Sequence, residues 1–68
     1  MPITEEVRTK LYATAKLLRA VAQPLGSACF LWDTIFDYEA LARGERTLAS
    51  AENLLDRLDR DYAYYGRS

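Results

Sequence analysis

The sequence predicts an all-α protein with one domain over residues 1–68, either a small three-helix bundle or a helical hairpin with a kinked first helix. Apolar residues recur at helical spacing in three stretches, about residues 4–23, 27–43 and 47–65. Breaks at residues 24–26 and at Gly44 separate these stretches. None of the three shows the strict alternation of a half-buried strand, so we expect helices throughout.

The first stretch has the features of a helix start. Thr4 can cap the helix, and Glu5 and Glu6 fall in its first turn, where the helix dipole favours acids. Pro24 and Gly26 interrupt the helix at its end, and the pattern leaves open whether they form a turn or a kink. The apolar residues expected to face the core are Val7, Leu11, Leu18, Val21 and Leu25.

The second stretch is apolar over most of its circumference, which is typical of a buried helix. Ser27 is the expected N-cap, and Gly44 lies where a left-handed residue often ends a helix. One apolar face comprises Ala28, Leu31, Ile35, Tyr38 and Ala42, and a second comprises Cys29, Trp32, Phe36 and Ala40. A narrow polar strip holds Asp33, Thr34 and Asp37. Two apolar faces require two packing partners.

The third stretch predicts a helix that packs against another helix at a shallow angle. Thr47 or Ser50 is the expected cap, and Gly66 is the expected stop. If this helix runs antiparallel to the second, the tyrosines near residue 62 lie beside Phe30 and Leu31. The heptad-like seam that supports this packing is Leu48, Ala51, Leu55, Leu58, Tyr62 and Tyr65.

The small size of the chain predicts self-association. A protein of 7.8 kDa buries only about 60% of its unfolded surface, which is marginal for a monomer. With one cysteine and no histidine, the chain has neither an internal disulfide nor a tetrahedral zinc site to stabilise it. We therefore expect the core to be completed by a homodimer or a higher oligomer.

The net charge and the hydropathy of the chain argue against nucleic-acid and membrane partners. A net charge of −1 and a pI near 5.2 argue against nucleic-acid binding, because such domains usually carry a basic patch. Glu5 and Glu6 stand where a signal peptide would be basic, and no apolar run is long enough to span a membrane. A single cysteine fits a reducing compartment. The expected location is cytoplasmic, with no membrane partner.

The residues argue against an enzyme, a metal site and a cofactor. Cys29 lacks the histidine that usually activates a thiol, and is expected to be a small buried residue. Asp33 and Asp37 share a helix face and could bind a cation, but we expect them to face solvent. Glu39 falls inside the apolar arc, where a buried carboxylate could be functional. The expected alternative is an ion pair with Arg43 at i,i+4.

We predict a non-catalytic protein-interaction module: an adaptor, an inhibitor or a small subunit. Tyrosine and tryptophan dominate protein interfaces, and the aromatic residues gather in the second helix and at the end of the third. Tyr64 lies off the seam and is expected to be the most exposed of the tyrosines at this end. The predicted contact residues are Cys29, Trp32, Phe36, Tyr62, Tyr64 and Tyr65.

A small oligomeric binder of a nucleotide-like molecule is the alternative. Aromatic rings can stack on a base while guanidinium groups bond a phosphate, in a cleft between subunits. The candidate residues are Arg46, Arg57, Arg60 and Tyr64. The run from Glu45 to Ala49 and the Leu-rich helix after it, about a third of the chain, resemble the second half of small phage-encoded helical hairpins that sequester cyclic-nucleotide signals. That resemblance keeps a cyclic nucleotide among the candidate ligands.

Overall fold

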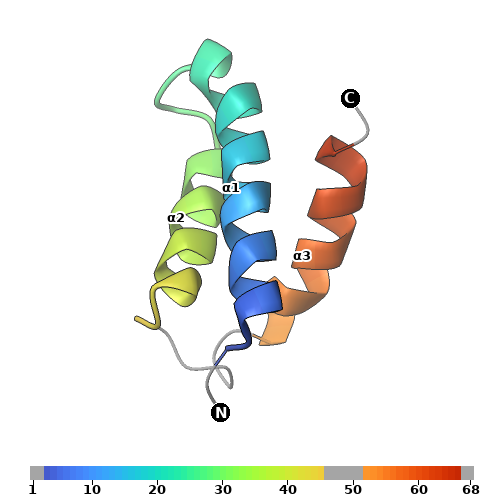
Figure 1. Cartoon of the computed structure of the whole chain (residues 1–68). Helices are drawn as coiled ribbons and strands as arrows, with labels where there is room; N and C mark the ends of the chain where they lie inside the picture. Colours follow the sequence, from blue (N-terminus) through green and yellow to red (C-terminus); the bar gives the residue numbers. More distant parts are fainter. Residues whose placement is uncertain (1–2, 46–51, 67–68) are drawn as a thin grey trace.

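The computed structural model describes residues 3–45 and 52–66, and over these residues the predicted all-α fold is confirmed. Three helices follow one another: α1 (Glu5–Leu25), α2 (Leu31–Ala42) and α3 (Glu52–Tyr65). Figure 1 shows α1 between the other two, with α1 and α3 running in the same direction and α2 running opposite to both. The described part of the chain is therefore an up-down-up bundle.

α1 begins where the sequence predicts, and it ends two residues after the predicted end. The Thr4 hydroxyl accepts a hydrogen bond from the backbone N–H of Val7 at 3.2 Å, which confirms the cap. The helix continues through Pro24, and Gly26 ends it with φ at 91°. Gly26 donates its N–H to the carbonyls of Ala22 and Gln23. The break between the first two helices is thus a turn at a left-handed glycine, where a Cβ would add strain.

The buried face of α1 is rotated from the predicted one. Val21 is exposed, and the side chain of Leu25 is 65% exposed, so both expectations were wrong. Ala15 and Ala22 occupy the interior instead, where their small side chains let α2 approach closely. The fully buried residues of α1 are Leu11, Thr14, Ala15, Leu18 and Ala22.

α2 begins at Leu31, four residues after the predicted start at Ser27. The carbonyl of Gly26 accepts hydrogen bonds from the backbone N–H of Cys29 at 3.2 Å and from the indole N–H of Trp32 at 2.9 Å. These bonds hold the residues before Leu31 in a turn, so Ser27 does not cap the helix. Phe30 stands at the N-cap position without a capping side-chain bond.

Two further expectations for α2 were wrong, and one is confirmed. Ala28, expected on an apolar face, lies exposed in the turn before the helix. Thr34, expected in the polar strip, is buried, and its hydroxyl accepts a hydrogen bond from Arg57 of α3 at 3.1 Å. Gly44 follows the helix with φ at 82°, as a left-handed terminating residue should.

The inward face of α3 also differs from the predicted seam. Leu58 is buried and Tyr65 partly buried as expected, but Leu54 is buried as well, whereas Tyr62 is 44% exposed. Asp61 occupies the inner position between Leu58 and Tyr65, facing α2. The cap candidates Thr47 and Ser50 and the seam residues Leu48 and Ala51 lie outside the described residues.

The core is built mainly by α1 and α2. Tyr38 is its largest fully buried side chain. Within the described ranges α3 adds Leu54 and Leu58 to this core, and Tyr65 packs against its edge. The buried apolar residues are Leu11, Ala15, Leu18, Ala22, Leu31, Ile35, Tyr38, Leu41, Ala42, Leu54 and Leu58.

Candidate interaction surfaces

Trp32 and Phe36 form an aromatic pair on the outer side of α2, and we call these two rings the aromatic face. They lie one helical turn apart, with ring centroids separated by 5.9 Å. Phe36 is 53% exposed, and Trp32 is partly buried against the core. The sequence predicted both residues as contacts, and the structure places them together.

Arg19 of α1 lies against the aromatic face. Its guanidinium carbon is 5.5 Å from the centroid of Trp32 and 6.0 Å from that of Phe36. A cation at this distance is attracted to the negative ring faces. Trp32 is also held by its indole hydrogen bond to the carbonyl of Gly26. Trp32 is therefore held from two sides, by Gly26 and by Arg19.

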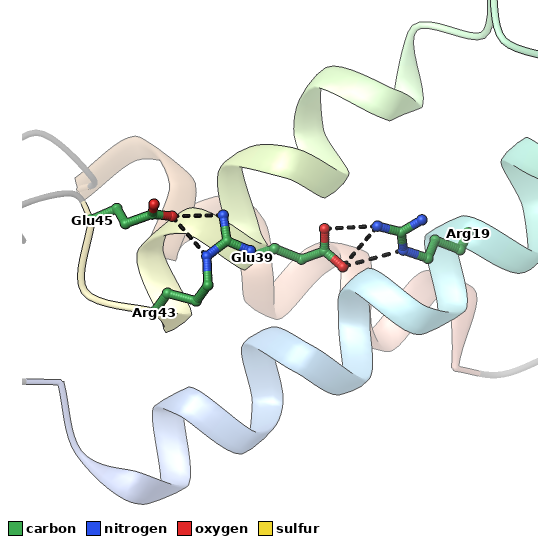
Figure 2. Close-up of polar contacts among 4 residues, drawn as sticks. All are labelled: Arg19, Glu39, Arg43 and Glu45. Carbon is green, nitrogen blue, oxygen red and sulfur yellow. Dashed lines mark hydrogen bonds and ion pairs between the residues drawn. The ribbon is translucent and has the colours of Figure 1, made fainter.

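Glu39 completes this arrangement, and its partner differs from the predicted one. Arg19 donates from Nη2 to both carboxylate oxygens of Glu39, at 2.8 and 2.9 Å, and from Nε to Oε2 at 3.2 Å (Figure 2). Arg43, the predicted partner, donates instead to Glu45, from Nε at 2.7 Å. The i,i+4 expectation was wrong because Arg19 reaches Glu39 from the neighbouring helix with a bidentate geometry that is stronger and more directional.

Cys29 directly precedes the aromatic face, and its carbonyl accepts a hydrogen bond from the backbone N–H of Trp32 at 3.2 Å. It sits in the turn before α2 and is partly buried against the core. Phe30, which was not among the predicted contact residues, is much more exposed. A helical wheel that starts at residue 27 could not predict the exposure of these two side chains, because residues 27–30 are not helical.

The tyrosines of α3 divide between core and solvent. Tyr64 is 74% exposed, as expected, and its ring forms a T-shaped pair with that of Tyr65 at a centroid distance of 4.9 Å. Burial, and next the charge of Asp61, raise the pKa of Tyr65 above its ordinary value. Tyr62 faces α1, where its ring lies 5.3 Å from the ammonium group of Lys10.

Three of the four residues predicted for a nucleotide-like ligand line one hollow. Arg57, Arg60 and Tyr64 surround a volume of about 440 Å³ together with Asp61 and Tyr65. Arg46 lies outside the described residues. This hollow belongs to a single helix of one chain, whereas the prediction placed the site between subunits. The carboxylate of Asp61 reduces the positive potential that the two guanidinium groups create.

A partly buried polar contact that was not predicted from the sequence lies beside this hollow. The Tyr38 hydroxyl donates a hydrogen bond of 2.6 Å to Oδ2 of Asp61. Burial first, and the bond to Asp61 second, raise the pKa of Tyr38 far above that of a free tyrosine. The signal was the position of Asp61, three residues after Leu58 and four before Tyr65, on an otherwise apolar stripe.

A groove between α1 and α3 has a volume of about 790 Å³. Its walls are mostly small or apolar side chains, and Lys16 is the charged group on its rim. This groove was not predicted from the sequence, because small residues give no amphipathic signal. Its lining is Ala13, Lys16, Leu17 and Ala20 of α1, with Tyr62, Ala63 and Gly66 of α3.

Comparison with known proteins adds no relative. No protein-family model matches the chain, and neither a curated protein nor a solved structure matches it.

Among the helices of the described residues, none has both the length and the apolar character needed to cross a membrane. The same residues contain no group of three or more cysteine and carboxylate side chains placed to hold a metal ion.

Proposed function

We propose that this protein is a non-catalytic interaction module, an adaptor, inhibitor or small subunit, that binds a protein partner through Trp32 and Phe36. The observation that carries this proposal is the ring pair on α2, in which a partly buried Trp32 lies beside an exposed Phe36 and both rings contact the guanidinium of Arg19. Tryptophan and arginine are among the residues that contribute most to binding energy at protein interfaces. Their placement in one cluster supports a contact surface here.

The rigidity of the cluster favours binding. Side chains that must be ordered on association each oppose it by about 0.5–1.5 kcal/mol. Trp32 is already held by Gly26, and Arg19 is already held by Glu39. Because Glu39 neutralises Arg19, the cluster presents rings rather than net charge, so we expect an apolar partner surface with polar groups around it.

Comparative capture tests the proposal. Tagged wild-type protein, Phe36→Ala and Tyr64→Ala are incubated with lysate of the source cells, and bound proteins are quantified by mass spectrometry. Tyr64 is a matched control, because it is an exposed aromatic residue on another helix. We expect a protein captured by the wild type and Tyr64→Ala to be lost with Phe36→Ala, and purified partner and chain to repeat this pattern by calorimetry. Equal capture by all three chains would count against the proposal.

The second candidate function is binding of a nucleotide-like molecule. The observation that favours it is the convergence of Arg57, Arg60 and Tyr64 on one hollow. Guanidinium groups bond phosphates, and an exposed phenol ring can stack on a base. A thermal-shift panel of linear and cyclic nucleotides tests it: a shift that Arg60→Ala abolishes supports this function, and a panel without any shift removes it.

A further inference from the structure

The groove between α1 and α3 continues along α1 toward its start. A neighbouring hollow of about 330 Å³ shares Ala13 and Tyr62 with it and extends it to Glu6 and Thr9. The combined groove thus follows the outer side of α1 over more than half of the helix. Tyr62 stands beside it as a wall from α3.

The side of α1 that faces this groove has the spacing of a helix-packing seam. Glu6, Thr9, Ala13, Lys16 and Ala20 follow one another at intervals of 3, 4, 3 and 4 residues. Such spacing presents one stripe to a neighbouring helix at a shallow angle. This outer seam is separate from the buried face of α1, and in the described chain no helix covers it. The small side chains of Thr9 and Ala13 at its centre allow a close helix approach.

The charged side chains of α1 indicate which kind of partner the outer seam fits. Most of them are already paired within the chain: Arg8 with Glu5, Lys10 with Asp59, and Arg19 with Glu39. Among the described residues, Glu6 and Lys16 have no ion-pair partner. They lie on the outer seam, the acid near the start of α1 and the base ten residues later. At a rise of 1.5 Å per residue this separation is about 15 Å.

We infer that a second copy of this chain docks into the groove, with the two α1 helices antiparallel about a twofold axis. Facing residues of two antiparallel helices have position numbers with a constant sum. A sum of 22 pairs Glu6 of each copy with Lys16 of the other, and the same register places Thr9 of each copy against Ala13 of the other. One register therefore satisfies the unpaired charges and brings the smallest residues to the crossing point. A twofold contact is the commonest way in which identical chains associate.

Charge-reversal variants test this dimer by sedimentation velocity and native mass spectrometry. Glu6→Lys and Lys16→Glu each turn two attractive pairs into two repulsive ones, and we expect each to raise the dimer Kd by at least about tenfold. An equimolar mixture of the two variants restores opposite charges at both contacts, so we expect a mixed dimer with a Kd near that of the wild type. Circular dichroism verifies that each variant keeps its helices.

Two matched controls make the result specific. Asp33→Lys and Arg60→Glu change net charge by the same amounts on exposed positions outside the groove, and we expect them to dimerise like the wild type. Phe36→Ala should also dimerise normally, because Phe36 does not line the groove. The absence of a dimer would therefore leave the proposed partner binding by the aromatic face unaffected. A wild-type monomer at millimolar concentration would overturn the inference. So would single variants that dimerise normally, or a mixture that does not recover.

Discussion

The hydrogen bond between Tyr38 and Asp61 joins α3 to the interior, and Tyr38→Phe removes it with little change in shape. The Tyr38 ring is fully buried, and its hydroxyl donates to a carboxylate at 2.6 Å. A hydrogen bond to a charged group contributes about 1.5–3 kcal/mol to stability. Asp61 is only half-buried and can regain water, so the lower end of that range applies.

We therefore expect Tyr38→Phe to lower the free energy of unfolding by about 1.5 kcal/mol. With an unfolding entropy of about 2.1 cal/mol/K per residue, this lowers Tm by about 10 °C. Urea unfolding and calorimetry measure both values. Tyr64→Phe serves as the control, because its exposed hydroxyl should contribute less than about 0.5 kcal/mol. A double-mutant cycle with Asp61→Asn isolates the pair, and a coupling energy near zero would refute the reasoning.

Two further predictions concern buried side chains. Thr14 is fully buried, and its hydroxyl has no hydrogen-bond partner among the described residues. Thr14→Val should therefore raise the free energy of unfolding by about 1 kcal/mol, whereas Thr14→Ser should lower it. A urea midpoint of Thr14→Val at or below that of the wild type would contradict this prediction. Above pH 10 Tyr38 loses its proton in the unfolded chain, while its raised pKa keeps the proton in the folded chain. The free energy of unfolding should therefore fall with rising pH, by up to about 1.4 kcal/mol per pH unit. Tyr38→Phe should lack this component, and parallel stability curves of the two proteins between pH 9 and 11.5 would show that the pKa of Tyr38 is not raised.

The helices could be predicted because each carries local signals. Helical periodicity, the Thr4 cap and the glycine at position 44 depend on residues close in sequence, and all three are confirmed. The start of α2 could not be predicted in this way. Ser27 is a good cap in isolation, but the carbonyl of Gly26 accepts bonds from Cys29 and Trp32 and holds the chain in a turn.

The orientation of side chains depended on contacts between helices. Glu39 has a cation four residues away in Arg43, yet it bonds Arg19, which is twenty residues away in sequence. On α3, Leu58 and Tyr65 belong to two overlapping stripes, one through Tyr62 and one through Asp61. Apolarity favours the first, but the buried hydroxyl of Tyr38 requires an acceptor and selects the second.

The unequal contribution of the helices to the core means that the bundle does not open uniformly. Leu54 and Leu58 are the buried apolar residues that α3 contributes within the described ranges, while α1 and α2 supply the others. Segments with few buried apolar contacts open at lower free energy than the molecule as a whole. The amide protons of α3 should therefore exchange with solvent through partial opening, while those at the centre of α1 and α2 wait for global unfolding. Since α3 also forms one wall of the groove, any ligand of that groove should slow exchange in α3.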